Sequence, residues 1–281
     1  MIIVQLRGGL GNQLFQYALG RHLAFLNQTE LKLDISLLNE VNSWTYRTYS
    51  LNDFNIKATL ATKDEINRLR GRWGGFVPFL GSQKAFVEPH FHFYMPVLSL
   101  KDDIYLDGYW QSEKYFIDIA EVIREDFTFK VLGSDTYEVL KECITQCHAV
   151  SVHIRRGDYV TNSKANRYFK PCEAEYYQKA IQYLVKYISN PVFFVFSDDI
   201  QWAKANFKID FPTHFVEGNS AQEDLWLMAS CGYQIIANST FSWWGAWLNQ
   251  QPDKIVIAPQ TWFSTERFDT KDLLPESWIR L

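Results

Sequence analysis

Two adjacent arginines and an acid follow an apolar strand pattern near the middle of the chain, in the segment AVSVHIRRGDYV. Arginine presents a planar fork of N–H donors that suits phosphate and keeps its charge at any working pH. Because neighbouring side chains at a strand end point to opposite faces, one of Arg155 and Arg156 can face a ligand and the other a structural partner. Gly157 permits a sharp turn, and Asp158 can cap or pair. The alternative is an Arg–Asp surface network after an ordinary strand.

A second group of polar residues precedes a helical pattern. Asn238, Ser239 and Thr240 lie between the strand-like YQIIAN and the helix-like FSWWGAWLN. Backbone N–H groups at a helix start, with hydroxyls beside them, form an anion site that needs no metal. Asp224, early in the preceding helical pattern, either reaches the same crevice or is a stabilising charge on its own helix N-terminus.

Adjacent acids, Asp198 and Asp199, end another strand pattern. They could hold a divalent ion or a ribose, but the metal-bridging spacing D-x-D occurs nowhere in the chain. Capping of the following helix by Ser197 or Asp198 is therefore the favoured interpretation, and no metal site is expected.

A glycine-rich turn, RGGLGNQLFQ, joins the first strand pattern to the first helical pattern. Gly9 and Gly11 with the acid Asp34 suggest a dinucleotide fingerprint, but Leu14 stands where the third glycine belongs. The turn nevertheless predicts bare backbone at Gly11 and a polar side chain, Asn12, near a ligand. The alternative is a tight turn with Asn12 as a helix cap.

Composition limits the classes of function. The 281 residues are 47% hydrophobic and carry a net charge of −4, which offers no basic field for nucleic acid. No apolar stretch is long enough to cross a bilayer, and the first residues are too short a run for a signal peptide. The four cysteines form no CxxC pair, so we expect a reducing, cytoplasmic location.

Strand and helix patterns alternate along the chain, which predicts an α/β fold with two Rossmann-like domains and parallel sheets. We expect strands at 2–6, 30–34, near 104–108 and at five places after residue 148, with helices at 63–70 and 112–127 among others. The expected domains are 1–140, on the acceptor side, and 141–281, which binds a nucleotide sugar. A last helix could pack back on the first domain.

The segments GGLGNQLFQYALGRHLA, GYWQSEKYF, HIRRGDY and NSTFSWWGAWLN resemble, in order and spacing, the motifs of α-1,2-fucosyltransferases of glycosyltransferase family 11, particularly bacterial members. The resemblance implies a GT-B arrangement of two domains facing a cleft. It also implies transfer of fucose from GDP-β-L-fucose to the 2-hydroxyl of a terminal galactose on a glycan, with inversion and without a metal or other cofactor.

The resemblance also implies roles for individual residues. Arg155 would hold the β-phosphate of the donor and His153 would line the nucleotide site. Asp224 would read the guanine edge, and Ser239 and Thr240 would lie at the phosphates. Asn238 belongs to the same donor-binding segment.

An inverting transfer needs a base for the attacking hydroxyl. Asp158 is the candidate because it is the acid nearest the Arg155 turn; its alternative is a salt bridge to Arg156 or Arg7. Asn12 could orient the acceptor instead. The acceptor itself is expected to depend on the irregular segment 37–93.

Three other functions compete with this interpretation. The partial fingerprint with Asp34 would suit an NAD-type oxidoreductase or epimerase. The tryptophan-rich segment 243–247 could form the surface of a non-catalytic glycan-binding protein, although core packing is favoured for it. A transferase of the same fold could use another nucleotide sugar, because a phosphate site does not distinguish sugars.

Overall fold

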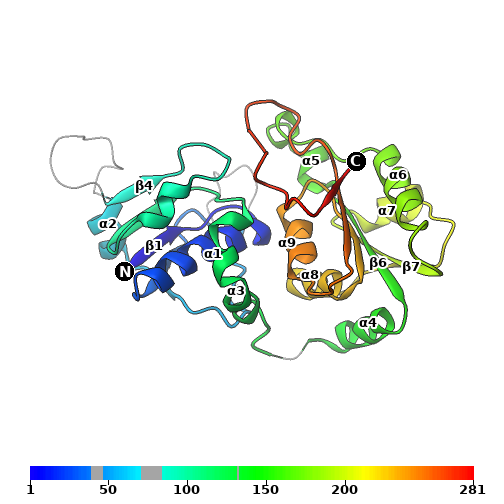
Figure 1. Cartoon of the computed structure of the whole chain (residues 1–281), viewed down its shortest axis with the longest axis horizontal. Coiled ribbons are helices and arrows are strands. Elements are labelled where there is room, and N and C mark those ends of the chain that lie inside the picture. The colour runs from blue at the N-terminus through cyan, green and yellow to red at the C-terminus, as the bar shows by residue number, and fades with distance from the viewer. Residues whose placement is uncertain (39–46, 71–83, 132) are drawn as a thin grey trace. The chain divides into compact units, whose positions relative to one another are not determined.

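The computed structural model describes residues 1–38, 47–70, 84–131 and 133–281. It divides into two compact units (Figure 1). Unit 1 contains residues 1–130 and 268–273, and unit 2 contains residues 131–267 and 274–281. Each unit is a parallel sheet flanked by helices, so the predicted α/β class with two parallel sheets is confirmed.

Among its described residues, unit 1 has a five-stranded sheet in the order β3-β2-β1-β5-β4. Its strands are β1 (Ile2–Gln5), β2 (Leu31–Asp34), β3 (Thr59–Leu60), β4 (Ala85–Val87) and β5 (Ile104–Asp107). The central strand β1 is buried along its whole length, as expected for a strand covered on both faces. All the pairings are parallel, so the strands' carboxyl ends share one edge.

The helices of unit 1 are α1 (Leu10–Leu26), α2 (Lys63–Arg70) and α3 (Ala120–Asp126), with short 3-10 turns at Met95–Ser99, Glu113–Tyr115 and Ile117–Ile119. Helix α1 packs closely on β1, since a Cβ at Gly20 would lie 2.4 Å from a methyl of Val4. The single helix expected at 112–127 is wrong: two 3-10 turns precede a shorter α3.

Unit 2 has, over its described residues, a six-stranded sheet in the order β11-β10-β9-β6-β7-β8. Its strands are β6 (His148–Ile154), β7 (Pro191–Ser197), β8 (Thr213–Phe215), β9 (Tyr233–Ile235), β10 (Ile255–Ala258) and β11 (Ile279–Arg280). The five expected strands are present, and β11 is an edge strand that the sequence pattern did not indicate. The sheet is again parallel.

The helices of unit 2 are α4 (Asp135–Thr145), α5 (Gly157–Thr161), α6 (Ala174–Leu184), α7 (Ile200–Asn206), α8 (Ala221–Ser230) and α9 (Thr240–Leu248), with a 3-10 turn at Ala165–Arg167. Side chains of α6 and α7 pack with Val150, Val152 and Ile154 into an apolar core on one face of the sheet. His153 alternates with these residues along β6 and therefore points to the opposite face.

The tryptophan-rich helix α9 belongs to the core of unit 2. Trp243 and Trp244 are fully buried and Trp247 is 3% exposed. Helix α9 touches α8 closely at Gly245, where a Cβ would lie 2.9 Å from the Cβ of Met228. The core interpretation of these tryptophans is confirmed, and they form no glycan-binding surface.

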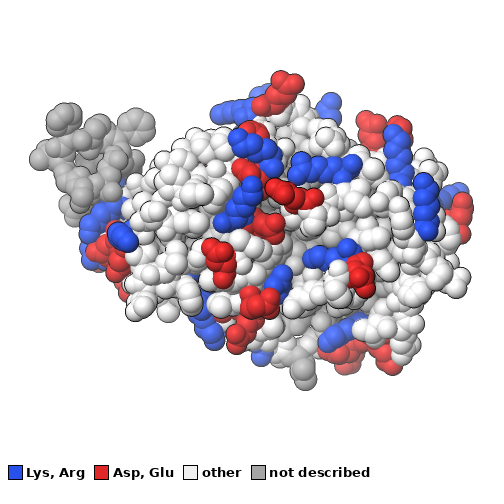
Figure 2. Space-filling model, in the orientation of Figure 1, with Lys and Arg blue, Asp and Glu red and all other residues white. Residues whose placement is uncertain are grey.

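Residues 249–281, all of which the structure describes, contain no helix, so the expectation of a last helix packing on the first domain is wrong. Instead, the turn-rich segment 268–273 belongs to unit 1, where Asp272 accepts a hydrogen bond from the Phe93 N–H at 3.1 Å and pairs with Lys114 at 2.6 Å. No helix among the described residues is long and apolar enough to span a bilayer. Acidic and basic side chains are interspersed over the visible face (Figure 2).

Candidate donor site in unit 2

The strand order of unit 2 brings the conspicuous loops together. From β6 the chain continues to β7 and β8 on one side, then crosses to β9 and β10 on the other. The change of direction lies between β6 and β9, and ligands of open α/β sheets bind beyond the carboxyl ends of strands at such a point. Arg155 follows β6, and the segment of Asn238 and Ser239 follows β9.

Arg155 lies at this edge between two carboxylates. Its Nη2 is 2.5 Å from Asp158 Oδ1 and its Nη1 is 3.0 Å from Asp198 Oδ2. Its guanidinium also lies 5.4 Å from the ring centre of Tyr159. Burial alone would lower the pKa of Arg155, but Asp198 and Asp158 outweigh it and raise that pKa. Arg155 is thus a fixed positive charge, and two ion-pair contacts leave N–H donors of its fork for a ligand.

Asp198 connects the end of β7 to the turn after β6. Besides pairing with Arg155, it accepts a hydrogen bond from the Arg156 backbone N–H at 2.9 Å. A Cβ at position 157 would lie 2.2 Å from Asp198 Oδ2. Gly157 is therefore needed for space and not for an unusual turn, since it begins helix α5.

Arg156 has the structural surroundings. Its guanidinium carbon lies 3.6 Å from the ring centre of Trp202, and Nε is 3.5 Å from Asp199 Oδ2. Asp199 also caps α7 by accepting from the Trp202 N–H at 3.3 Å. The expected cap was Ser197 or Asp198, so the capping interpretation holds but its residue is Asp199.

His153 is buried at the end of β6, 4% exposed, and its ring centre lies 5.6 Å from that of Phe241 in α9. Burial first, and the charge of Arg155 second, lower its pKa to about 3. The imidazole is therefore neutral at physiological pH. Among the described residues, its Nδ1 has no hydrogen-bond partner although it is buried. The Nδ1 of His153 can therefore form a hydrogen bond with a ligand that binds at the start of α9.

The start of α9 offers hydroxyls and backbone donors. Ser239 is the N-cap, accepting from the Phe241 N–H at 3.4 Å, and Thr240 is the first helical residue. Asn238 has a structural role: its amide donates at 3.0 Å to the carbonyls of Lys170 and Trp262. Ser239 and Thr240 thus remain as candidate phosphate ligands, while the Asn238 side chain fixes the loop beneath them.

Asp224 does not cap helix α8, although its sequence position allowed that role. Ser220 and Glu223 form the capping box of α8, whereas Asp224 Oδ1 accepts from Asn219 Nδ2 at 3.1 Å. Helices α8 and α9 both begin at the carboxyl edge of the sheet, and they touch where Met228 meets Gly245. Asp224 lies about one helical turn before Met228 in α8, and Phe241 lies about one helical turn before Gly245 in α9. Asp224 and Phe241 are therefore at the same height above the sheet edge. Burial raises the pKa of Asp224 to about 6.

Sequence reasoning missed two residues of this site. Asp198 was considered as a helix cap, a metal ligand or a ribose ligand, yet it pairs with Arg155. Asn219 carries a buried Oδ1 that has no hydrogen-bond partner in the described chain, next to Asp224. The position of Asp198 directly after a strand was a sequence signal for a site residue. No sequence signal indicated Asn219.

Asp158, the expected base, forms a salt bridge with Arg155. Arg156 and Arg7 were the partners that the sequence suggested. Arg7 instead pairs with Asp107 in unit 1.

The glycine-rich turn of unit 1 differs from a dinucleotide fingerprint. Helix α1 begins at Leu10 with Gly9 as its N-cap, so Asn12 does not cap it; Asn12 Oδ1 accepts from Gln111 Nε2 at 2.9 Å. Asp34, the acid of the fingerprint, is fully buried and accepts from the Tyr105 hydroxyl at 2.6 Å. An acid enclosed in this way cannot bind a ribose, which removes the main support for an NAD-type enzyme.

Gly8 has the left-handed backbone of this turn, with φ of +77°, and a Cβ there would lie 2.3 Å from Asn12 Nδ2. Gly11, by contrast, is a buried residue inside α1. Asn12 and Gly11 therefore pack within unit 1 at the carboxyl end of β1.

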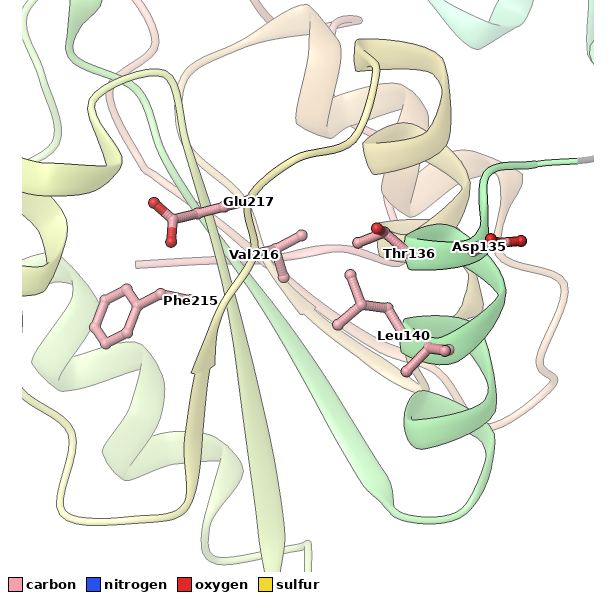
Figure 3. Close-up of a pocket in the computed structure, with 7 residues that line it drawn as sticks. Asp135, Thr136, Leu140, Phe215, Val216 and Glu217 are labelled. Atoms are coloured by element: carbon pink, nitrogen blue, oxygen red, sulfur yellow. The ribbon is translucent and has the colours of Figure 1, made fainter.

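A cavity of about 510 Å³ lies elsewhere in unit 2 (Figure 3). It is lined by one side of α4 and by the end of β8, namely Asp135, Thr136, Val139, Leu140, Phe215, Val216 and Glu217. None of these is a candidate donor-site residue, so the candidate site rests on side-chain geometry and not on this hollow. The described residues contain no group of three or more His, Cys, Asp or Glu side chains arranged to hold a metal ion.

Comparison with known proteins supports the resemblance seen in the motifs. The family model "Glycosyl transferase family 11" matches residues 82–281. An alpha-1,2-colitosyltransferase of Escherichia coli is 38% identical over 100% of this chain and 99% of its own length. The O-antigen biosynthesis glycosyltransferase WbnK of Escherichia coli is 36% identical, covering 98% of this chain and 99% of its own.

A solved structure also supports the fold. The crystal structure of fucosyltransferase NodZ from Bradyrhizobium superposes with a TM-score of 0.51, covering 87% of this chain and 91% of that one, at 15% sequence identity. At that identity the likeness concerns the fold alone.

Proposed function

Because this chain belongs to glycosyl transferase family 11 and is a glycosyltransferase, we propose that it transfers L-fucose from GDP-β-L-fucose to the 2-hydroxyl of a terminal galactose, with inversion. Unit 2 binds the donor and unit 1 binds the acceptor. The observation that carries the proposal is Arg155, fixed by two carboxylates at the change of strand direction.

The residues around Arg155 suit a nucleoside diphosphate. Arg155 contacts the β-phosphate, and Ser239 and Thr240 present hydroxyls and backbone donors at the start of α9. His153 supplies a buried nitrogen that lacks a partner in the described chain. Asp224 accepts hydrogen bonds from the guanine edge, whose adjacent N–H donors match a carboxylate.

The chemistry follows from where charge develops. As the bond from fucose to GDP lengthens, negative charge grows on the leaving phosphate, and a pre-placed arginine and helix start stabilise it. In this proposal the arginine and the helix start stabilise the leaving phosphate without a metal ion. Asp158, with its carboxylate on Arg155, keeps the guanidinium in place, and we assign it this positioning role in preference to that of base.

Calorimetric titration of the EDTA-treated protein with GDP, ADP and UDP tests the donor site. We expect GDP to bind and the other two to bind at least about tenfold more weakly, because only guanine satisfies Asp224. Radiolabelled transfer from GDP-fucose to lactose or another galactoside, with product linkage read by NMR, tests the reaction. Equal binding of the three nucleotides would contradict the role of Asp224.

A second donor deserves the same assay, because the 38% identical relative is named a colitosyltransferase. Colitose lacks one ring hydroxyl of fucose, and a site built to bind that hydroxyl discriminates strongly against a sugar that lacks it. Parallel measurement of kcat/KM with GDP-fucose and GDP-colitose decides between them. A higher value for GDP-colitose would replace fucose in the proposal while leaving the GDP site intact.

A further inference from the structure

The carboxyl edge of the unit 1 sheet holds a second group of polar side chains. In unit 1 the change of strand direction lies between β1 and β5, since β2 and β3 continue on one side of β1 and β4 lies beyond β5 on the other. The motif GYWQSEKYF begins there, directly after β5, and no residue of that motif has a role in the donor site.

Glu88 is fixed at this edge by the start of that motif. It follows β4, and its Oε2 accepts from the Tyr109 N–H at 2.7 Å while its Oε1 accepts from the Trp110 N–H at 3.0 Å. Each oxygen keeps accepting capacity after one hydrogen bond. A Cβ at Gly108 would lie 2.5 Å from the Glu88 Cβ, so the glycine allows the loop to close against Glu88.

The loop is also strained and incompletely satisfied. Trp110 has a φ of +58°, which is unusual for a residue other than glycine and is typical of functional loops. Trp110 is fully buried and Gln111 is 6% exposed. Within the described chain, the Trp110 Nε1 and the Gln111 Oε1 have no hydrogen-bond partner. The motif that holds Glu88 thus leaves one buried donor and one buried acceptor without a partner in the described chain.

An exposed aromatic ring completes the group. Tyr109 is 38% exposed, and the Arg7 guanidinium lies 5.6 Å from its ring centre. Arg7 is neutralised by Asp107, with which it forms an ion pair. The Glu88 carboxylate repels an anion such as a phosphate, and it accepts hydrogen bonds from hydroxyl groups. A neutral ligand with several hydroxyls and an apolar face, which is a sugar, fits this combination best.

We propose that Glu88 and Tyr109 form the acceptor-sugar subsite, in which the Glu88 carboxylate accepts hydrogen bonds from acceptor hydroxyls and the Tyr109 ring packs against the sugar face. The inference rests on the proposed transferase function and names the residues of unit 1 that recognise its acceptor. Glu88 lies in the segment 37–93, where acceptor choice was expected from sequence, and Tyr109 follows the strand β5, which pairs with β4 beside Glu88.

The titration of Glu88 gives the subsite a pH signature. Burial, the largest cause, raises the pKa of Glu88 to about 7, opposed by the backbone donors and by Arg7. Asp107, Tyr109 and Tyr115 are the other titratable groups that interact with it. A protonated carboxyl accepts fewer hydrogen bonds, so acceptor affinity falls as the pH drops below about 7.

The test compares Glu88→Gln, Tyr109→Ala and the control Glu121→Gln, which changes an exposed acid of α3. Transfer is measured with acceptor varied at saturating GDP-fucose, together with GDP affinity and with hydrolysis of GDP-fucose in the absence of acceptor. We expect acceptor KM to rise by about 10–100-fold in Glu88→Gln, the size of a lost charged hydrogen bond. GDP affinity and hydrolysis should stay at wild-type values, and the control should match the wild type.

Two further readouts keep the outcome decisive. The wild-type acceptor KM should rise between pH 8 and pH 6, whereas that of Glu88→Gln should be flat. If Glu88→Gln does not fold, Tyr109→Ala decides, because the backbone N–H of residue 109 still holds Glu88. Unchanged acceptor KM in the folded variants would overturn the subsite alone. Absence of GDP binding and of transfer in the wild type would overturn the proposed function and the subsite with it.

Discussion

At the scale of single residues, Arg155 and Arg156 are neighbours with opposite surroundings. Arg155 lies between Asp158 and Asp198 at the change of strand direction, whereas Arg156 stacks on Trp202. Strand geometry predicts that the two side chains diverge, but the residue types alone do not say which one meets the ligand. The position of Asp198, directly after the neighbouring strand β7, supplies that answer.

This difference predicts unequal effects of two matched substitutions. Arg155→Ala should lower kcat by about 10²–10³, the usual cost of one pre-placed charge on a leaving group. Arg156→Ala should keep kcat within a few-fold and lower thermal stability instead, because it removes packing on Trp202. Steady-state kinetics and thermal melts of both variants measure this. Equal losses of kcat would show that Arg155 has no special role.

Asp224 carries a second residue-scale prediction, through its pKa of about 6. Its carboxylate form is the one that accepts from guanine, so GDP affinity should fall about tenfold per pH unit below pH 6. The Asp224→Asn variant should bind GDP more weakly at pH 8 and lose this dependence. Calorimetry at pH 5, 6 and 8 checks both points. If GDP affinity depends on pH equally in the wild type and the variant, a group other than Asp224 titrates.

The same raised pKa has a consequence for stability with the opposite sign. An aspartate in the unfolded chain has a pKa of about 3.9, so the folded state holds the Asp224 proton more tightly. The stabilisation is full below pH 4 and is lost as the pH rises through about 6. Asp224→Asn should therefore flatten this part of the stability profile.

At the scale of elements, the β6 turn and the end of β7 act as one structure through Gly157 and Asp198. A Cβ at position 157 would displace the Asp198 carboxylate from Arg155 and from the Arg156 N–H. Gly157→Ala should thus lower both stability and kcat. The double variant Gly157→Ala/Asp198→Ala should lose less than the sum of the two single variants, since both act on one contact. Additive losses in melts and kinetics would argue that the two residues act independently.

Elements were predictable from sequence where one pattern dominated. The runs of β-branched and aromatic residues in β6 and β7 and the helix Lys63–Arg70 were predicted correctly. The region 112–127 was not, because Tyr115, Phe116 and Ile119 are buried in unit 1 and their packing breaks the helix. The two-residue strand β11 is too short to show a pattern. Asp34 looked like a ligand-binding acid because its partner, the Tyr105 hydroxyl, is distant in sequence.

At the scale of the whole molecule, the chain consists of two units that each place polar loops at the carboxyl edge of a parallel sheet. The loops of unit 2 carry Arg155 and the start of α9, which suit a diphosphate. The loops of unit 1 carry Glu88 and Tyr109, which suit a neutral sugar. This division predicts that donor and acceptor stabilise different parts of the protein.

Hydrogen–deuterium exchange with GDP alone tests the division. A ligand at 100 times its Kd stabilises the state that binds it by about 2.7 kcal/mol. GDP should therefore slow exchange at the ends of β6 and β9 and at the start of α9. The turn from β1 to α1 should be unaffected, and so should the Glu88 loop. Protection at the β1–α1 turn with none at α9 would place the nucleotide in unit 1. The glycine-rich turn would then be the nucleotide site, although the burial of Asp34 argues against that role.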